Sequence, residues 1–514
     1  MNPSHPAWHP PPDNAGATPS ERYLSTVARR AFLSLWSHSN VYTDEGRSNG
    51  KGDGKELCDL LVVFGDHVIL FSDKHCEFKP HADIEVAWAR WYRRAVEKSV
   101  RQLLGAEGFL KNHPGRLFLD KGCTQPLPLD LPSPERAKYH LVAATRGSHA
   151  AAVEHWHGHS SGSFILDNSI EGDAHHGHPF HIGWPAGRQR FIHVLDEMAL
   201  DVVLDELDTV PDFIDYLEKK EVLLTTPGVV VSTSGEEDLV AQYLMTLRDG
   251  AHAFRNIPAA FDYVLFPEGE WTEYEKSPQR ISKKVADSDS RRWDALIEMQ
   301  SGFIRSGAAL NPISGLPSEF VSPHYNDHER IVRTLADETR LSRRVLEKHL
   351  KHALSINERG RRFARIAESP WRPGRFYVFL TIPKPPEDTY DDYRAARFES
   401  LFTYCHGLKT RFPTATEVIG ITSEPIPLEG SSQDFLFVDM GNEPLSREVS
   451  AALKEALDEA EILQDSTMKL TRRKTEPEFP FPFSQHGFDG SHAPLNRAQR
   501  RAQEAKNRSK KRRQ

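Results

Sequence analysis

The chain has 514 residues, of which 38% are hydrophobic and 27% charged, with a formal net charge of −8. Its length is sufficient for about three domains, and its composition is typical of a soluble globular protein rather than a disordered or fibrous one. No stretch approaches the roughly 20 apolar residues of a membrane helix, and residues 1–18, rich in Pro and His, do not resemble a secretory signal. The four cysteines are widely spaced and form no Cys-x-x-Cys, which favours a reducing compartment. We therefore expect a cytoplasmic protein with no membrane association and with a disordered segment at residues 1–18.

The first predicted element is a helix from Ser20 to Trp36. Ser20 is a suitable N-cap, and Glu21 follows it in the first turn. Apolar residues recur at helical spacing behind them. They are Leu24, Val27, Ala28, Ala31, Phe32 and Leu35.

Residues 54–77 predict a hairpin of two apolar strands with a tight turn at Gly65-Asp66. Asp59 lies near the start of the first strand, and Asp73-Lys74 closes the second. Because paired strands rise about 3.3 Å per residue and lie about 4.8 Å apart, the turn brings the two ends together. A carboxylate and an ammonium group are thus expected to meet at one edge of a sheet. Metal-assisted phosphodiester cleavage needs this combination, since carboxylates hold Mg²⁺ and a lysine stabilises charge on the phosphate or positions a water.

This hairpin resembles the core of the restriction-endonuclease-like PD-(D/E)xK nucleases, in which an acid on one strand is followed by an acid-x-Lys on the next. Asp59 matches the first acid, and Lys74 falls at the expected spacing. Ser72 occupies the position of the second acid. Asp73 points to the other face of the strand unless a bulge re-aims it, and Glu56 is an alternative source of the missing carboxylate.

The resemblance implies an N-terminal α/β domain that binds Mg²⁺ (or Mn²⁺) and hydrolyses DNA, with RNA not excluded. The implied metal ligands are Asp59, Glu56, Asp73 and Glu21. Lys74 would be catalytic together with Asp59, Asp73 and Glu56. Gln102, on a predicted helix from Ile84 to Leu110, would add a polar group to the catalytic site. Nucleases with such an architecture are frequent in prokaryotic restriction and anti-phage defence, so a protein partner from such a system is also expected.

Further along the chain we predict a nuclease-like domain at 19–185, a mainly helical domain at 190–365, an α/β domain at 370–465 and a Pro-rich, then basic, tail at 466–514. The first domain should contain further strands at 139–145 and 162–166, some of them parallel. Helices are predicted at 195–207, 212–220, 236–248, 290–301, 329–352, 390–409 and 446–463. Strands are predicted at 376–381, 417–421 and 433–438.

Three further groups of residues have more than one interpretation. Arg340, Arg343, Arg344, Lys348 and Lys351 share one predicted helix and form either a solvated face or a stripe facing phosphates. The histidines between 149 and 193 form a structural zinc site or line the rim of an active site. The basic residues of 497–514 contact phosphates or only aid solubility.

Two rival functions remain open. In the first, the fold is retained but catalysis is lost, and the protein only binds nucleic acid, as Ser72 at the acid position suggests. In the second, the hairpin is purely structural and the protein binds a partner or acts as a scaffold.

Overall fold

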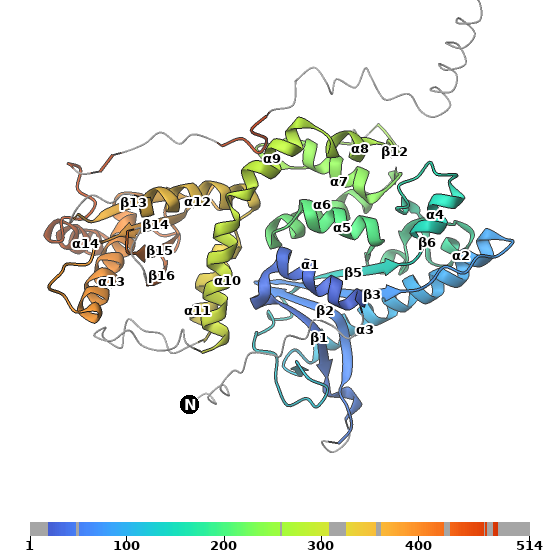
Figure 1. Ribbon diagram of the computed structural model, residues 1–514, viewed down its shortest axis with the longest axis horizontal. Helices are drawn as coiled ribbons and strands as arrows, with labels where there is room; N and C mark the ends of the chain where they lie inside the picture. Colours follow the sequence, from blue (N-terminus) through green and yellow to red (C-terminus); the bar gives the residue numbers. More distant parts are fainter. Residues whose placement is uncertain are drawn as a thin grey trace, which may run out of the picture.

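The computed structural model describes residues 19–47, 51–257, 260–307, 325–355, 361–425, 432–466, 468–469 and 476–481. These residues form a mixed α/β structure built around one six-stranded and two four-stranded sheets. The six-stranded sheet and the last sheet lie at opposite ends of the molecule, and helices stand between them (Figure 1). The α/β class predicted from the sequence is confirmed at this level. The predicted segment 1–18 and most of the predicted tail lie outside the described residues.

The first sheet has the strand order β4-β1-β2-β3-β5-β8. Strands β1, β2 and β3 are antiparallel, whereas β3, β5 and β8 are parallel. Its strands and helices are α1 (Pro19–Trp36), β1 (Ser37–Thr43), β2 (Lys55–Phe64), β3 (His67–His75), α2 (Ile84–Tyr92), a π-helical turn (Arg93–Glu97), α3 (Lys98–Asn112), β4 (Leu117–Phe118), β5 (Lys138–Arg146), α4 (His149–His155) and β8 (His193–Leu195).

The predicted hairpin is present, with Phe64 paired to His67 across a two-residue turn. Gly65 has φ +59°, a backbone conformation that glycine adopts without strain. Helix α1 packs on one face of the sheet, where the rings of Phe32 and Phe71 lie 5.9 Å apart. Helix α3 covers the opposite face, where Ser99 meets Ser72. The hairpin is therefore buried on both sides, which explains its continuous apolar strands.

A second sheet has the order β12-β9-β6-β7, with β6 (Ile165–Glu171), β7 (His181–Trp184), β9 (Val230–Thr233) and β12 (Tyr263–Phe266). Strand β6 begins three residues later than predicted, because Gly162 has φ +88° and Phe164 donates its N–H to Asp196 rather than to a strand. The helices that follow are α5 (Glu197–Glu206), α6 (Val210–Leu224), α7 (Glu236–Met245), α8 (Glu270–Glu275), α9 (Pro278–Ser288) and α10 (Arg291–Arg305).

The single helix predicted at 329–352 is wrong, because the chain forms α11 (Tyr325–Ala336) and α12 (Arg340–Ser355). Between them Glu338 is fully buried and accepts hydrogen bonds from Tyr377 Oη (2.8 Å) and Ser369 Oγ (2.7 Å). A buried carboxylate must find such partners, and the break in the helix places it against the last sheet.

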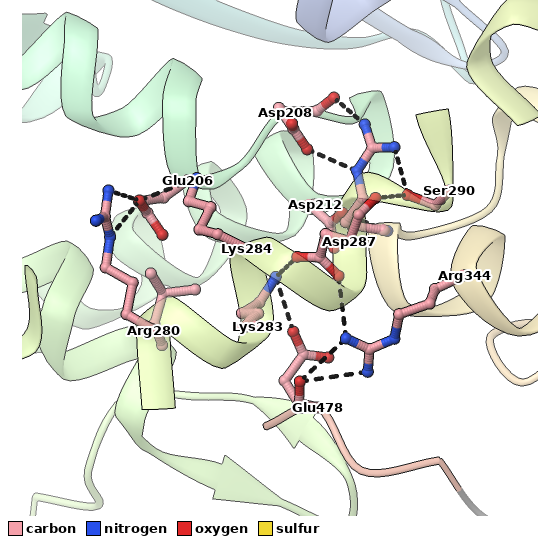
Figure 2. A network of polar contacts seen from close by, with 12 residues as sticks. Glu206, Asp208, Asp212, Arg280, Lys283, Lys284, Asp287, Ser290, Arg344 and Glu478 are labelled. Carbon is pink, nitrogen blue, oxygen red and sulfur yellow. Dashed lines mark hydrogen bonds and ion pairs between the residues drawn. The ribbon is translucent and has the colours of Figure 1, made fainter. Parts of the chain in front are cut away.

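Both interpretations of the basic cluster on α12 are wrong for its three arginines, which are 3% exposed or less. Arg340 pairs with Asp208 (2.8 Å), and Arg343 pairs with Asp294 (2.7 Å). Figure 2 shows Arg344 between Asp287 and the backbone of Glu478, within a network that joins α5, α6, α9, α12 and residues 476–481. The pairs of Arg340 and Arg343 with Asp294 add α10 to this network. The three arginines form buried ion pairs between α12 and other parts of the central region, and they do not face solvent or phosphate.

The last sheet has the order β13-β14-β15-β16, with β14 and β15 parallel and the outer pairs antiparallel. Its elements are β13 (Phe363–Glu368), β14 (Arg375–Thr381), α13 (Tyr390–Gly407), β15 (Glu417–Ser423), β16 (Gln433–Asp439) and α14 (Arg447–Glu459). Strand β13 was not predicted. Within the described part of the chain, no helix is both long and apolar enough to span a bilayer.

Candidate active site

The first sheet opens between β2 and β3 at one end. Their pairing runs from Phe64–His67 to Leu60–Phe71 and stops there. Strand β2 stays paired to β1 as far as Lys55, and β3 stays paired to β5 as far as His75. Asp59 and Ser72 are the next residues along the two strands, so they lie where the strands separate. We call this place the fork.

The structure brings Asp59 and Lys74 together at the fork. Asp59 Oδ2 accepts the backbone N–H of Asp73 (2.6 Å) and lies 3.3 Å from Lys74 Nζ. The Asp59 side chain is 5% exposed, whereas that of Lys74 is 30% exposed. The pKa of Asp59 is raised, because burial outweighs the attraction of Lys74 and the hydrogen bond from Asp73. The acid is thus enclosed, while the ammonium group reaches solvent.

Ser72 and Gln102 form a neutral polar pair beside this contact. The Ser72 hydroxyl lies 2.9 Å from Gln102 Oε1 and 3.1 Å from Ser99 Oγ, both on α3. Ser72 and Lys74 are two residues apart on a strand and so face the same side. Gln102, predicted as a member of the site, therefore lies next to the position where the nuclease pattern has its second acid.

The structure does not bring Asp73 to this group. Its Oδ1 lies 3.3 Å from Arg146 Nε, and its buried Oδ2 has no hydrogen-bond partner among the described residues. Arg146 in turn lies over the ring of Tyr23 on α1, 4.8 Å from its centroid. The carboxylate of Asp73 is therefore on the α1 side of the sheet, whereas Ser72 contacts α3. Burial is the main cause that raises the pKa of Asp73, against the attraction of Arg146.

Glu56 and Glu21 contribute negative charge near the fork. The pKa of Glu56 is raised first by loss of solvent and then by repulsion from Asp59 and Glu21, while Lys74 opposes the shift. Glu21 also raises the pKa of Asp59. Asp59, Glu56 and Glu21 thus lie within electrostatic reach of one another, Asp59 also repels Asp73, and a bound cation would relieve this repulsion. Glu56, on β2, keeps access to solvent although its neighbours displace part of its hydration, and Glu21 lies in the first turn of α1.

Among the described residues, two groups of three place metal-ligating atoms within 4.8 Å of one another, and neither is the predicted set at the fork. One is His67, His140 and Glu218; the other is Glu97, Asp173 and His176. The acids at the fork would have to move closer together to share one ion. Sequence reasoning missed the first group entirely, because its members come from separate elements and form no motif.

The His-rich segment does not behave as one unit. His175 and His193 are buried, whereas His157, His159 and His178 are exposed. Burial lowers the pKa of His175 to about 4. The interpretation as exposed or partly buried rim histidines fits only part of the segment, and of its histidines only His176 belongs to a group of potential ligands within the described residues.

Comparison with known proteins adds no assignment, since no family model, curated protein or solved structure matches this chain.

Proposed function

We propose that the N-terminal α/β unit is a metal-dependent nuclease that hydrolyses phosphodiester bonds in DNA, with RNA not excluded. The observation that carries this proposal is the 3.3 Å contact between Asp59 Oδ2 and Lys74 Nζ at the fork. A buried acid and a solvent-accessible lysine meet there, on the side of the sheet where Gln102 also lies.

The order of elements supports the proposal. Helix α1 is followed by the antiparallel strands β1, β2 and β3, then by the long α2–α3 helix and the parallel strand β5. The resemblance to PD-(D/E)xK nucleases leads us to expect an opening helix, a hairpin with the acid and lysine, and a helix packed on the sheet. The order of elements in the chain supports the proposal for this reason.

Each group at the fork has a chemical role in this proposal. Asp59 would hold Mg²⁺ or Mn²⁺ with help from Glu56 and Glu21, and the bound ion would supply Lewis-acid stabilisation of the phosphate. Lys74 would stabilise the negative charge that develops on the phosphate and orient the attacking water. Gln102 and Ser72 would position that water or a phosphate oxygen through hydrogen bonds. Asp73, bound to Arg146, would support the fork without touching the substrate.

The remaining parts of the chain would recognise a substrate, a trigger or a protein partner, as in a prokaryotic defence or restriction system. This step rests on analogy of architecture alone.

A nucleic-acid-binding protein without catalysis is the second candidate. It is favoured by Ser72 in place of an acid and by the engagement of Asp73 with Arg146. Among the described residues named at the fork, Asp59 is then the one buried acid on the lysine side.

Incubating the purified chain with plasmid DNA and with structured RNA, in Mg²⁺, Mn²⁺ or EDTA, separates these candidates. Cleavage that needs the metal and is lost in Lys74→Ala supports the nuclease. Retention of nucleic acid in a filter-binding assay without cleavage favours the second candidate. Absence of both, with a folded protein, rejects both.

A further inference from the structure

A second cluster of potential metal ligands shares no residue with the fork. His176 Nε2 is 2.7 Å from Glu97 Oε1, and these two atoms and a carboxylate oxygen of Asp173 all lie within 4.8 Å of one another. Glu97 ends the π-helical turn between α2 and α3, and the other two belong to the 3-10 turn Gly172–Gly177. Turns of π-helix inside α-helices are frequent at functional sites.

The loop that carries Asp173 and His176 is held in place by their neighbour, His175. Its Nδ1 lies 2.7 Å from the carbonyl of Gly172, and its Nε2 accepts the N–H of Gly183 (2.9 Å). Its ring stacks on Tyr92 with the centroids 5.0 Å apart, and its carbonyl accepts the indole N–H of Trp88 (2.7 Å). Both ring nitrogens of His175 are thus used to fix the loop, which leaves His176 as the histidine directed at Glu97.

A buried hydroxyl with no partner lies beside this cluster. Tyr92 is 1% exposed, and its hydroxyl has no hydrogen-bond partner among the described residues. The ring of His176 stands edge-on to that of Tyr92, with the centroids 5.8 Å apart. Burial raises the pKa of Tyr92, and the negative charges of Glu97 and Asp173 add to that rise. A buried hydroxyl without a partner is costly, and a water on an ion bound at this place would donate a hydrogen bond to the Tyr92 oxygen.

We propose that Glu97, Asp173 and His176 bind one divalent transition-metal ion of the Zn²⁺ type. One imidazole nitrogen and two carboxylate oxygens are a donor set that Zn²⁺ accepts, and a fourth position would be left for water. Ligands at about 2.0–2.2 Å from a tetrahedral ion lie about 3.4 Å apart, so the His176–Glu97 pair would have to open by well under 1 Å. The ion would replace the direct contact between His176 Nε2 and the Glu97 carboxylate, and would join the Gly172–Gly177 turn to the α2–α3 helix.

The site is tested on the full-length protein after removal of metals with EDTA and dialysis. Zn²⁺ is titrated against a chromophoric chelator, and the bound metal is counted by mass spectrometry. We expect one equivalent in the wild type and in Asp59→Asn, because the site shares no residue with the fork. Glu97→Gln and His176→Ala are each expected to weaken the affinity by tenfold or more. Co²⁺ should give visible absorption bands in the wild type and lose them in the same two variants.

His178→Ala is the matched control, because His178 is exposed on the same loop and is not in the cluster. Glu97→Gln keeps a hydrogen-bond acceptor for His176, so we expect its fold to be intact. Its circular dichroism spectrum and melting temperature measure this. The proposal is overturned if the wild type binds no Zn²⁺, if both ligand variants bind as well as the wild type, or if His178→Ala loses the ion to the same extent. It is also overturned if the bound equivalent disappears in Asp59→Asn.

Discussion

The Asp59 carboxylate makes the hydrogen bond to Asp73 that a neighbouring strand would otherwise provide. Its Oδ2 accepts the backbone N–H of Asp73 at 2.6 Å and also lies 3.3 Å from Lys74 Nζ. Asp59 Oδ2 therefore holds the backbone of β3 at the fork and also pairs with the positive charge of Lys74. A variant intended to test chemistry at this position must keep an acceptor there, because a buried N–H without a partner would itself destabilise the protein.

Asp59→Asn meets this condition, since a side-chain carbonyl can accept from Asp73 and from Lys74 while the negative charge is lost. If Asp59 holds the metal, metal-dependent cleavage should fall by about 100-fold or more, while the melting temperature changes little. Initial rates of plasmid nicking at several Mn²⁺ concentrations measure the effect. Asp66→Asn is the matched control, because this acid lies in the turn of the same hairpin with a side chain 46% exposed. Equal rates in Asp59→Asn and the wild type would exclude Asp59 from the chemistry.

Gln102→Glu tests whether the fork lacks one carboxylate. The new acid would keep the contact with the Ser72 hydroxyl, 2.9 Å away, and would add charge on the lysine side of the sheet. We expect Mn²⁺ affinity to increase by about tenfold, which corresponds to about 1.4 kcal/mol. Isothermal titration with Mn²⁺ measures this change, and Gln102→Leu, which removes the polar group without adding charge, should not bind more tightly. An unchanged affinity in Gln102→Glu would place Gln102 outside the metal site.

The raised pKa of Asp59 predicts a pH limit for cleavage. The metal requires the deprotonated carboxylate, so activity should decline with falling pH at a value above the ordinary range of an aspartate. Lys74 lowers this pKa, so its replacement by methionine should raise it further. Carbon-13 NMR of the labelled carboxyl group follows the titration independently of activity.

The raised pKa of Asp59 also affects stability, with a pH dependence opposite to that of a carboxylate whose pKa is lowered by folding. A folded pKa above the unfolded one favours folding below the ordinary value, and that contribution is lost as the pH rises through the folded pKa. A titration of Asp59 at the ordinary value would contradict the prediction.

The hairpin was predictable because its signals are local. All of these signals lie within residues 54–77. They are the two runs of apolar residues, the turn at Gly65-Asp66, and the spacing between Asp59 and Lys74. Gln102 was proposed from the resemblance to PD-(D/E)xK nucleases, in which the helix after the lysine strand adds a polar residue to the site. The grouping of Glu21 with Asp59 and Glu56 is harder to predict from the sequence, because Glu21 lies on α1 and influences these acids only after α1 has packed on the sheet.

The buried arginines of α12 were not predictable, because their partners are distant in sequence. Arg344 lies far along the chain from Asp287 and even farther from Glu478, and each residue by itself is typical of a solvated surface. The same applies to His176 and Glu97, which meet only after the 3-10 turn has folded over the helix. A run of like charges on a predicted helix indicates a solvent-exposed face, because the sequence does not show which distant residues of opposite charge will pack against it.

The ion pair between Lys283 and Glu478 predicts that a short C-terminal segment stabilises the middle of the molecule. Lys283 Nζ lies 3.1 Å from Glu478 Oε1, and both side chains are less than a tenth exposed (Figure 2). Glu478→Ala would leave a buried ammonium group with Asp287 as its remaining carboxylate partner. We expect the free energy of unfolding to fall by about 3 kcal/mol, as is usual when one member of a buried pair is removed. Urea denaturation followed by tryptophan fluorescence measures the loss.

Asp465→Asn is the control for this prediction, because Asp465 pairs with Arg411 at the surface with a side chain 82% exposed. Its removal should cost less than about 1 kcal/mol. Lys283 and His252 hold the pKa of Glu478 well below its usual value, so the stabilisation is present above the ordinary glutamate pKa and is lost as the pH falls through the lowered one. The difference in stability between wild type and Glu478→Ala should therefore stay constant from neutral to mildly acidic pH. Equal losses in Glu478→Ala and Asp465→Asn would mean that residues 476–481 contribute no more than a surface contact.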